Sequence, residues 1–234
     1  MATNTSEKTK RMALSAIFCA LAFLVTLLPT PHVQFLSFDI KDTVIATASL
    51  LLGPACACAL SIAVPFLEFI TVGTTGPWGL LMDVLSTAAF SLTASLIYRF
   101  RKSLIGAILA LSASACLQIA VMMLANIFIT PLYLAASPAD IPAARQTVLG
   151  MLIPLLLPFN VIKSIFNASL VMLLYKPISE ALRRARLLQG GSRTGSPSGY
   201  RLRGKTLLVF LSSLAVTVAA LLLLFLVMKA GFAV

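Results

Sequence analysis

Charged side chains are scarce in this chain of 234 residues: they make up 11% of it, against 59% hydrophobic residues. Soluble domains average about 25% charged and 45–50% apolar residues. The mean hydropathy of +1.01 agrees with this imbalance. The composition therefore excludes an ordinary soluble domain and predicts an integral membrane protein.

Acidic residues are the rarer charged class, with seven Asp and Glu against 18 Lys and Arg and a formal net charge of +11. In a soluble protein that excess would suggest nucleic-acid binding. Here the basic residues lie between hydrophobic spans and form no basic face interleaved with aromatic residues. We expect no nucleic-acid partner, and we interpret the charge as a signal of orientation in the lipid bilayer.

Histidine and cysteine are also rare, with a single histidine and four cysteines. Cys56 and Cys58 lack the spacing and the second pair of a zinc site, and His32 is remote from them in sequence. We expect neither a metal nor a resident cofactor. All four cysteines, which include Cys19 and Cys116, are interpreted as small, buried, reduced hydrophobic side chains.

Long apolar runs are abundant. A helical crossing needs about 20 residues, so the run 43–71 exceeds one crossing and predicts two short helices that meet at Gly53-Pro54. The first run is too long, and its exit too poor in small residues, for a secretory signal. The other expected spans are 11–29, 78–98, 104–130, 151–177 and 207–228. Segments 30–42 and 137–146 are expected to be external loops, and 71–79 a turn.

The basic residues indicate the orientation of these spans. Fourteen of the 18 fall in 1–11, 99–102 and 176–205. Three fall on the opposite side: Lys41, Arg145 and Lys229. The positive-inside rule therefore places the N-terminus in the cytoplasm and, after a seventh span, the C-terminus outside.

The segment 151–177 carries the strongest functional signal, because Lys163 lies near the middle of an apolar span. Asn160, Lys163 and Asn167 are spaced i, i+3 and i+7, so they share one face of a helix. An ammonium group at this depth costs roughly 2.5–3.5 kcal/mol on insertion scales and usually faces a partner or a cavity. The stripe predicts a binding face for a polar ligand inside a membrane bundle.

Two prolines, Pro154 and Pro158, precede this stripe. Each removes a backbone donor, which predicts a kink and a free carbonyl beside the polar residues. An alternative for Lys163 is simple pairing with an internal acid, for which Asp83 and Glu68 are available. Asn167 is expected to pack against or steady the lysine and not to contact the ligand.

Four motifs stand out along the chain: Ala16-x-x-x-Ala20 after a basic start, FLSFDIKD (35–42), VMMLANIFITPLY (121–133) and LLPFNVIKSIF (156–166). Together they resemble the riboflavin-specific S component of energy-coupling factor (ECF) transporters, over about residues 10–180. The last two motifs are the specific part of the resemblance. The alanine motif is shared with S components for other vitamins.

The resemblance implies an all-α integral membrane fold, a six-helix transmembrane bundle of the ECF S-component type with an outward-facing pocket. The apolar run 207–228 adds a C-terminal seventh transmembrane helix, a departure from the family core. The expected divisions are a substrate-binding membrane domain (1–180), a basic Gly/Ser cytoplasmic linker (181–204) and the additional helix (205–234). The implied partners in the cell membrane are a T component and two cytoplasmic ATPase subunits. The chain has no Walker A motif, as expected of a transporter subunit that is not itself an enzyme.

The resemblance also implies site residues. Asn126, Asn160, Lys163 and Asp39 match the family's substrate-binding positions. The small-residue motif that contacts the T component is matched by two alanines, Ala16 and Ala20. Asp83 stands where family members often have an asparagine, and we expect it at the substrate.

The chemistry of these side chains suits a flavin. An Asn amide pairs with a donor–acceptor edge and a Lys ammonium donates to a ring carbonyl or nitrogen. Aromatic surface is available from Phe38, Phe128, Tyr133 and Phe159. Partners for the hydroxyl groups of a ribityl chain are expected among Asp39, Thr43 and Thr74–Thr75. Three alternatives stay open: an S component for another vitamin or flavin relative, a membrane scaffold, and an intramembrane enzyme that uses Asp83 with Glu68 as an acid pair.

Overall fold

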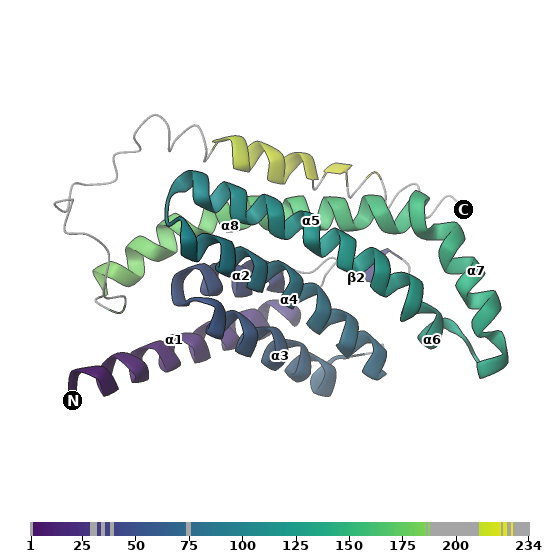
Figure 1. Cartoon of the computed structure of the whole chain (residues 1–234), viewed down its shortest axis with the longest axis horizontal. Coiled ribbons are helices and arrows are strands. Elements are labelled where there is room, and N and C mark those ends of the chain that lie inside the picture. The colour runs from purple at the N-terminus through teal and green to yellow at the C-terminus, as the bar shows by residue number, and fades with distance from the viewer. Residues whose placement is uncertain are drawn as a thin grey trace.

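The structure, a computed structural model, is a bundle of helices aligned with the long axis of the molecule (Figure 1). It describes residues 2–28, 32–33, 36–37, 40–73, 76–185, 187, 211–220, 222–223 and 226. The elements are α1 (Ala2–Thr26), β1 (His32–Val33), β2 (Leu36–Ser37), α2 (Lys41–Leu52), α3 (Pro54–Thr71), α4 (Gly76–Phe100), α5 (Leu104–Phe128), α6 (Thr130–Leu134), the 3-10 helix η1 (Pro138–Asp140), α7 (Ile141–Met151), the π-helix η2 (Leu152–Leu156) and α8 (Leu157–Arg184). A further helix, Leu211–Ala220, follows near the C-terminus.

Five helical segments of the described chain are long and apolar enough to cross a membrane. They are Glu7–Thr26, Pro54–Thr71, Gly76–Phe100, Leu104–Phe128 and Pro138–Leu182. The expectation of an all-helical membrane protein is confirmed. The 12-residue α2 rises only about 18 Å, shorter than a hydrocarbon core of about 30 Å, so it lies inside the bundle without spanning it alone.

The break at Gly53-Pro54 is confirmed. Gly53 has φ +99°, a conformation that favours glycine because it has no Cβ. Pro54 then begins α3, where its missing N–H is no loss. The two residues reverse the chain between α2 and α3.

Two expected boundaries are wrong. The chain is already helical from Ala2, so the polar start extends α1 instead of preceding it. The expected loop at 137–146 is η1 followed by the start of α7. The prolines of this segment, Pro138 and Pro142, sit in first turns, where the ring is tolerated. The composition of residues 137–146 therefore resembles that of a loop, although the backbone is helical.

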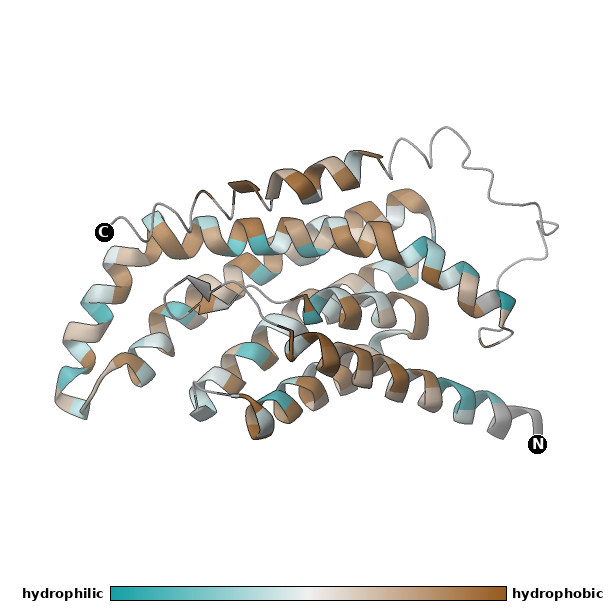
Figure 2. Ribbon diagram, turned by 180° about the vertical axis from the view of Figure 1, so that it is seen from behind, coloured by the Kyte–Doolittle hydropathy of each residue, from teal (hydrophilic) through white to brown (hydrophobic). Residues whose placement is uncertain are grey.

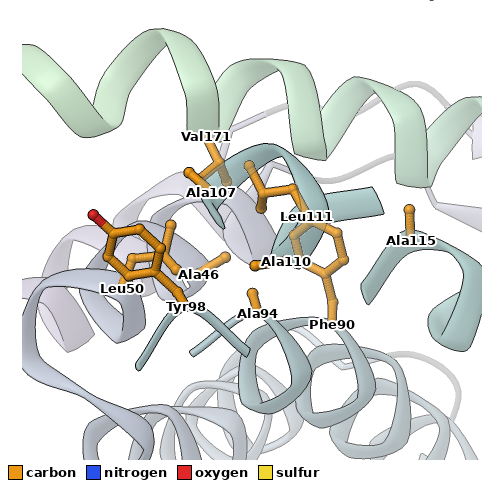
Figure 3. Close-up of a cluster of buried hydrophobic side chains, with 10 residues drawn as sticks. All are labelled: Ala46, Leu50, Phe90, Ala94, Tyr98, Ala107, Ala110, Leu111, Ala115 and Val171. Atoms are coloured by element: carbon orange, nitrogen blue, oxygen red, sulfur yellow. The ribbon is translucent and has the colours of Figure 1, made fainter. Parts of the chain in front are cut away.

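Small residues let the central helices approach closely (Figure 3). Tyr98, which belongs to the core between these helices, contacts Tyr175, and their hydroxyl oxygens lie 2.8 Å apart. The core joins α2, α4, α5 and α8. Its members are Ala46, Leu50, Phe90, Ala94, Tyr98, Ala107, Ala110, Leu111, Ala115 and Val171.

The two ends of the bundle differ in charge. The N-terminal turns of α1, the α4–α5 turn and the C-terminal end of α8 lie at the same end of the molecule (Figure 1). Hydrophilic residues mark this end in α1 and α8 (Figure 2). Exposed bases here are Lys8, Arg11, Arg99, Arg101, Lys102 and Arg184. The opposite end carries α6 and α7.

The interpretation of the cysteines is partly wrong. All four are free thiols, but Cys58 and Cys116 are exposed on α3 and α5. On the flank of an apolar helix, an exposed cysteine acts as one more hydrophobic surface group. Cys56 alone is fully buried.

Candidate functional site

The start of α8 is shaped by its prolines. A π-helical turn, Leu152–Leu156, precedes α8, and the Leu157 N–H donates to the carbonyl of Leu152. Asn160 Nδ2 donates to the carbonyl of Leu156 at 2.8 Å. The prolines predicted a kink and a free carbonyl. The structure shows a π-turn here, and the Leu156 carbonyl accepts from the Asn160 side chain.

The polar stripe of α8 faces the protein interior. Asn160, Lys163 and Asn167 are all buried. Beside them, Phe159 belongs to a hydrophobic cluster that also holds Leu36 of β2. The hairpin between α1 and α2 therefore packs against the first half of α8, near the stripe.

Asn126 lies at the matching level of α5. Its Nδ2 donates to the carbonyl of Met122 at 2.7 Å, and its Oδ1 accepts from the Thr130 hydroxyl at 2.9 Å. Met123 packs against the cluster that contains Phe159. The two asparagine-bearing helices therefore meet at this end of the bundle.

The first turn of α2 corrects the sequence interpretation. Lys41, expected in an external loop, is 1% exposed. Its ammonium group contacts Glu68 of α3 and lies 3.0 Å from Asp83 Oδ2 of α4. Glu68 and Asp83, the two acids considered as partners for Lys163, both pair with Lys41, because α2, α3 and α4 meet at this point.

Asp42, the next residue, ties α2 to two other helices. It accepts hydrogen bonds from the Thr87 hydroxyl at 2.7 Å and from Gln118 Nε2 at 3.1 Å. Gln118 Oε1 in turn accepts from the Ser164 hydroxyl of α8 at 2.8 Å. Sequence reasoning missed this network, although a lone glutamine in the middle of an apolar span was the available signal.

Thr43 completes the turn. Its hydroxyl donates to Asn167 Oδ1 at 2.8 Å, which joins α2 to α8. Three consecutive buried residues thus contact four different helices. Asn167 is held by Thr43, which sequence reasoning did not foresee.

The other expected site residues are distributed as follows. Phe38, Asp39, Thr74 and Thr75 lie outside the described residues. Phe159 is buried in the core, whereas Phe128 is 58% exposed and points away from the interior.

Tyr133 is half-buried on α6. Burial raises the pKa of its phenol, and a hydrogen bond with Thr130 opposes that rise. The phenol therefore stays neutral at physiological pH and keeps its O–H as a donor.

Ala16 and Ala20 are exposed on α1. Exposed small side chains leave a flat surface to which another helix can pack closely. Helix Leu211–Ala220 lies on the other side of the bundle from α1 (Figure 1), so it leaves this alanine face uncovered.

Comparison with known proteins agrees with this architecture. The family model of the ECF transporter substrate-specific component matches residues 10–175. The chain belongs to this family. The S component is 26% identical to the riboflavin transporter RibU of Staphylococcus aureus (strain TCH60) over 183 residues, which is 76% of this chain and 95% of that protein.

A solved structure of the S component of a bacterial ECF transporter superposes with a TM-score of 0.62 at 25% identity. The superposition covers 76% of this chain and 99% of the chain of the solved structure. The family match ends at residue 175, so helix Leu211–Ala220 lies outside the matched residues.

Proposed function

We propose that this S component binds riboflavin from the outer side of the cell membrane and delivers it together with a T component and two ATPase subunits. The proposed bundle counts α1 to α5 and the α7–α8 unit as its six helices, with the C-terminal helix as the seventh. The N-terminus is cytoplasmic in this arrangement and the C-terminus outside.

The observation that carries the proposal is the buried polar stripe of α8. Lys163 and the two asparagines beside it are enclosed by protein inside a membrane-length helix. Intramembrane ionisable residues cost free energy and typically mark a substrate path. The resemblance at these positions, with the similarity to a riboflavin transporter, supports a flavin as the substrate.

The proposed contacts come from three directions. Asn126 of α5 and Asn160 and Lys163 of α8 face the isoalloxazine ring, with Tyr133 as an aromatic wall. Phe38 and Asp39, which lie outside the described residues, are proposed as further substrate contacts on the basis of the sequence. Thr43 and Asp83 are proposed at its margin, where Lys41 holds the Asp83 carboxylate.

The charge distribution supports the proposed orientation. Most of the exposed bases gather at one end of the bundle, as the positive-inside rule requires of the cytoplasmic side, and Arg145 of α7 is an exception at the other end. The first halves of α7 and α8, with Asn160, lie toward the other end (Figure 1). A pocket there opens away from the ATPases.

A titration of the purified protein with riboflavin, followed by flavin fluorescence, tests the substrate. We expect saturable quenching, and Lys163→Met should weaken binding about 10- to 100-fold, because a hydrogen bond from a charged group contributes about 1.5–3 kcal/mol. The matched control is Lys8→Met, which removes an exposed lysine of α1. Wild-type protein without riboflavin quenching would refute the substrate, and binding of another vitamin would replace it.

A further inference from the structure

We propose that Asn167 determines substrate specificity from the deep side of the site, where its side-chain nitrogen donates a hydrogen bond to an acceptor atom of the substrate. The inference rests on the proposed function, since it describes the same site in more detail. It adds a third contact on α8, one turn beyond Lys163, and gives Thr43 the role of orienting the amide.

The amide of Asn167 is half satisfied. The residue is 0% exposed, and its Oδ1 accepts from the Thr43 hydroxyl at 2.8 Å. Its Nδ2 is the one buried side-chain nitrogen or oxygen of the described residues without a hydrogen-bond partner. Buried donors are almost always paired, because an unpaired one keeps the full cost of losing water.

In the other two asparagines of the proposed site, the side-chain nitrogen has a hydrogen-bond acceptor within the helix. Asn126 and Asn160 each donate from Nδ2 to the carbonyl four residues earlier in their own helix. For Asn167 that carbonyl belongs to Lys163. The Thr43 hydroxyl binds the amide oxygen and holds the group toward α2 instead. The nitrogen is thereby left available for a molecule that enters between α2 and α8.

The chemistry of this face selects acceptors. A Lys ammonium donates and never accepts, and the Asn167 amide, whose oxygen already accepts from Thr43, has its N–H donors unused. Lys163 and Asn167 are four residues apart on one face of α8, so together they form a pair of donors. Their complement is a ligand with two acceptors, such as a ring carbonyl beside a ring nitrogen, or hydroxyl oxygens of a polyol.

A flavin carries all of these acceptors, so the experiment changes them one at a time. Dissociation constants are measured for wild type, Asn167→Leu and Asn167→Asp. The aspartate keeps the shape and still accepts from Thr43 but replaces the N–H donor with oxygen. The ligands are riboflavin, 1-deaza- and 5-deazariboflavin, 2-thio- and 4-thioriboflavin, and lumiflavin, which lacks the ribityl hydroxyls.

We expect both substitutions to weaken riboflavin binding about tenfold, the usual value of one hydrogen bond in a dry site. For the analogue that lacks the acceptor which Asn167 contacts, the penalty should fall to within about twofold of no effect. An equal penalty for all ligands, or none for riboflavin, overturns the inference. Wild-type protein that fails to bind riboflavin overturns the proposed function itself.

Stability separates a substrate contact from a packing residue. The double variant Thr43→Val/Asn167→Leu removes both polar partners, so the ligand-free protein should melt no lower than wild type while riboflavin binds at least about tenfold more weakly. Thr47→Val is the matched control, because the Thr47 hydroxyl is equally buried but bonds only the Thr43 carbonyl of its own helix. A parallel loss of stability and affinity in the double variant would show a structural role and overturn the inference.

Discussion

Lys41 lies where α2 packs on α3 and α4, and its ammonium group holds two carboxylates there. Neither acid could be assigned to it from the sequence, because FLSFDIKD has the polarity of a loop and gives no sign that its lysine turns inward. The pairing of Lys41 with both acids has an electrostatic benefit. One buried cation lies against two carboxylates and offsets the repulsion between them.

We expect Lys41→Met to destabilise the protein by about 2 kcal/mol, below the 3–5 kcal/mol of a fully buried pair, because both acids are partly exposed to solvent. This should lower the melting temperature by about 5 °C. Lys10→Met, which changes a lysine on the first turns of α1, is the control. Adding Glu68→Gln should recover part of the loss, and a lack of any recovery would argue against repulsion as its cause.

The residues of the proposed site were predictable to different degrees. The polar stripe on α8 could be predicted from helical spacing alone. A lysine inside an apolar span is costly however the helix packs, so it predicts a polar face. The Asp42–Gln118–Ser164 network did not follow, because its members come from α2, α5 and α8. Only the rotation of each helix about its axis decides whether such side chains face one another.

At the scale of elements, α1 exposes Ala16 and Ala20, whereas Phe18 and Ala22 of the same helix are buried in the core. An exposed alanine face is a surface for close helix packing, and the proposed partner there is the T component. Recognition of substrate and coupling to the partner would then use opposite parts of the molecule, since the polar stripe belongs to α8.

We expect Ala16→Trp and Ala20→Trp to reduce riboflavin uptake at least tenfold in cells that contain the full transporter, because a large ring prevents close helix approach. Riboflavin binding by the purified variants should stay within about twofold of wild type, because the alanines lie outside the pocket. Leu109→Trp on the exposed flank of α5 is the control. Equal loss of binding and uptake would contradict a separate coupling face.

The helices themselves were largely predictable, and the exceptions have a physical cause. The apolar runs and the Gly53-Pro54 break locate most boundaries, because both signals are local. The prolines at 138 and 142 suggested a loop, yet each lies in the first turn of a helix, where no N–H is needed. The π-turn before α8 is another case in which proline was an incomplete guide. Pro158 predicts an irregularity in the helix but not its form.

At the scale of the whole molecule, helix Leu211–Ala220 extends the bundle. Thr217 Oγ1 lies 2.7 Å from Ser169 Oγ of α8, and Ala220 enters the cluster of Phe159 and Phe166. The helix therefore packs against the same element that carries the polar stripe, on the side away from Ala16 and Ala20.

We expect removal of all residues after 187 to lower the melting temperature by several degrees while riboflavin affinity changes less than about twofold, because the helix supports α8 from outside the pocket. Thr217→Val should cost about 0.6 kcal/mol, the mean for a hydrogen bond between membrane helices. The control is Thr26→Val, since the Thr26 hydroxyl bonds only within α1. An unchanged melting temperature of the truncated protein would mean that the helix does not stabilise the bundle.

The sequence by itself determined the membrane class, most of the helices, the buried stripe of α8 and the resemblance to S components. These properties depend on composition and on spacing along one segment, which local physics controls. Only the tertiary structure decided that Lys41 gathers Glu68 and Asp83, and that Thr43 leaves one side of the Asn167 amide without a partner. Partners across helices depend on how each helix is rotated and packed, and spacing within a single helix does not specify that.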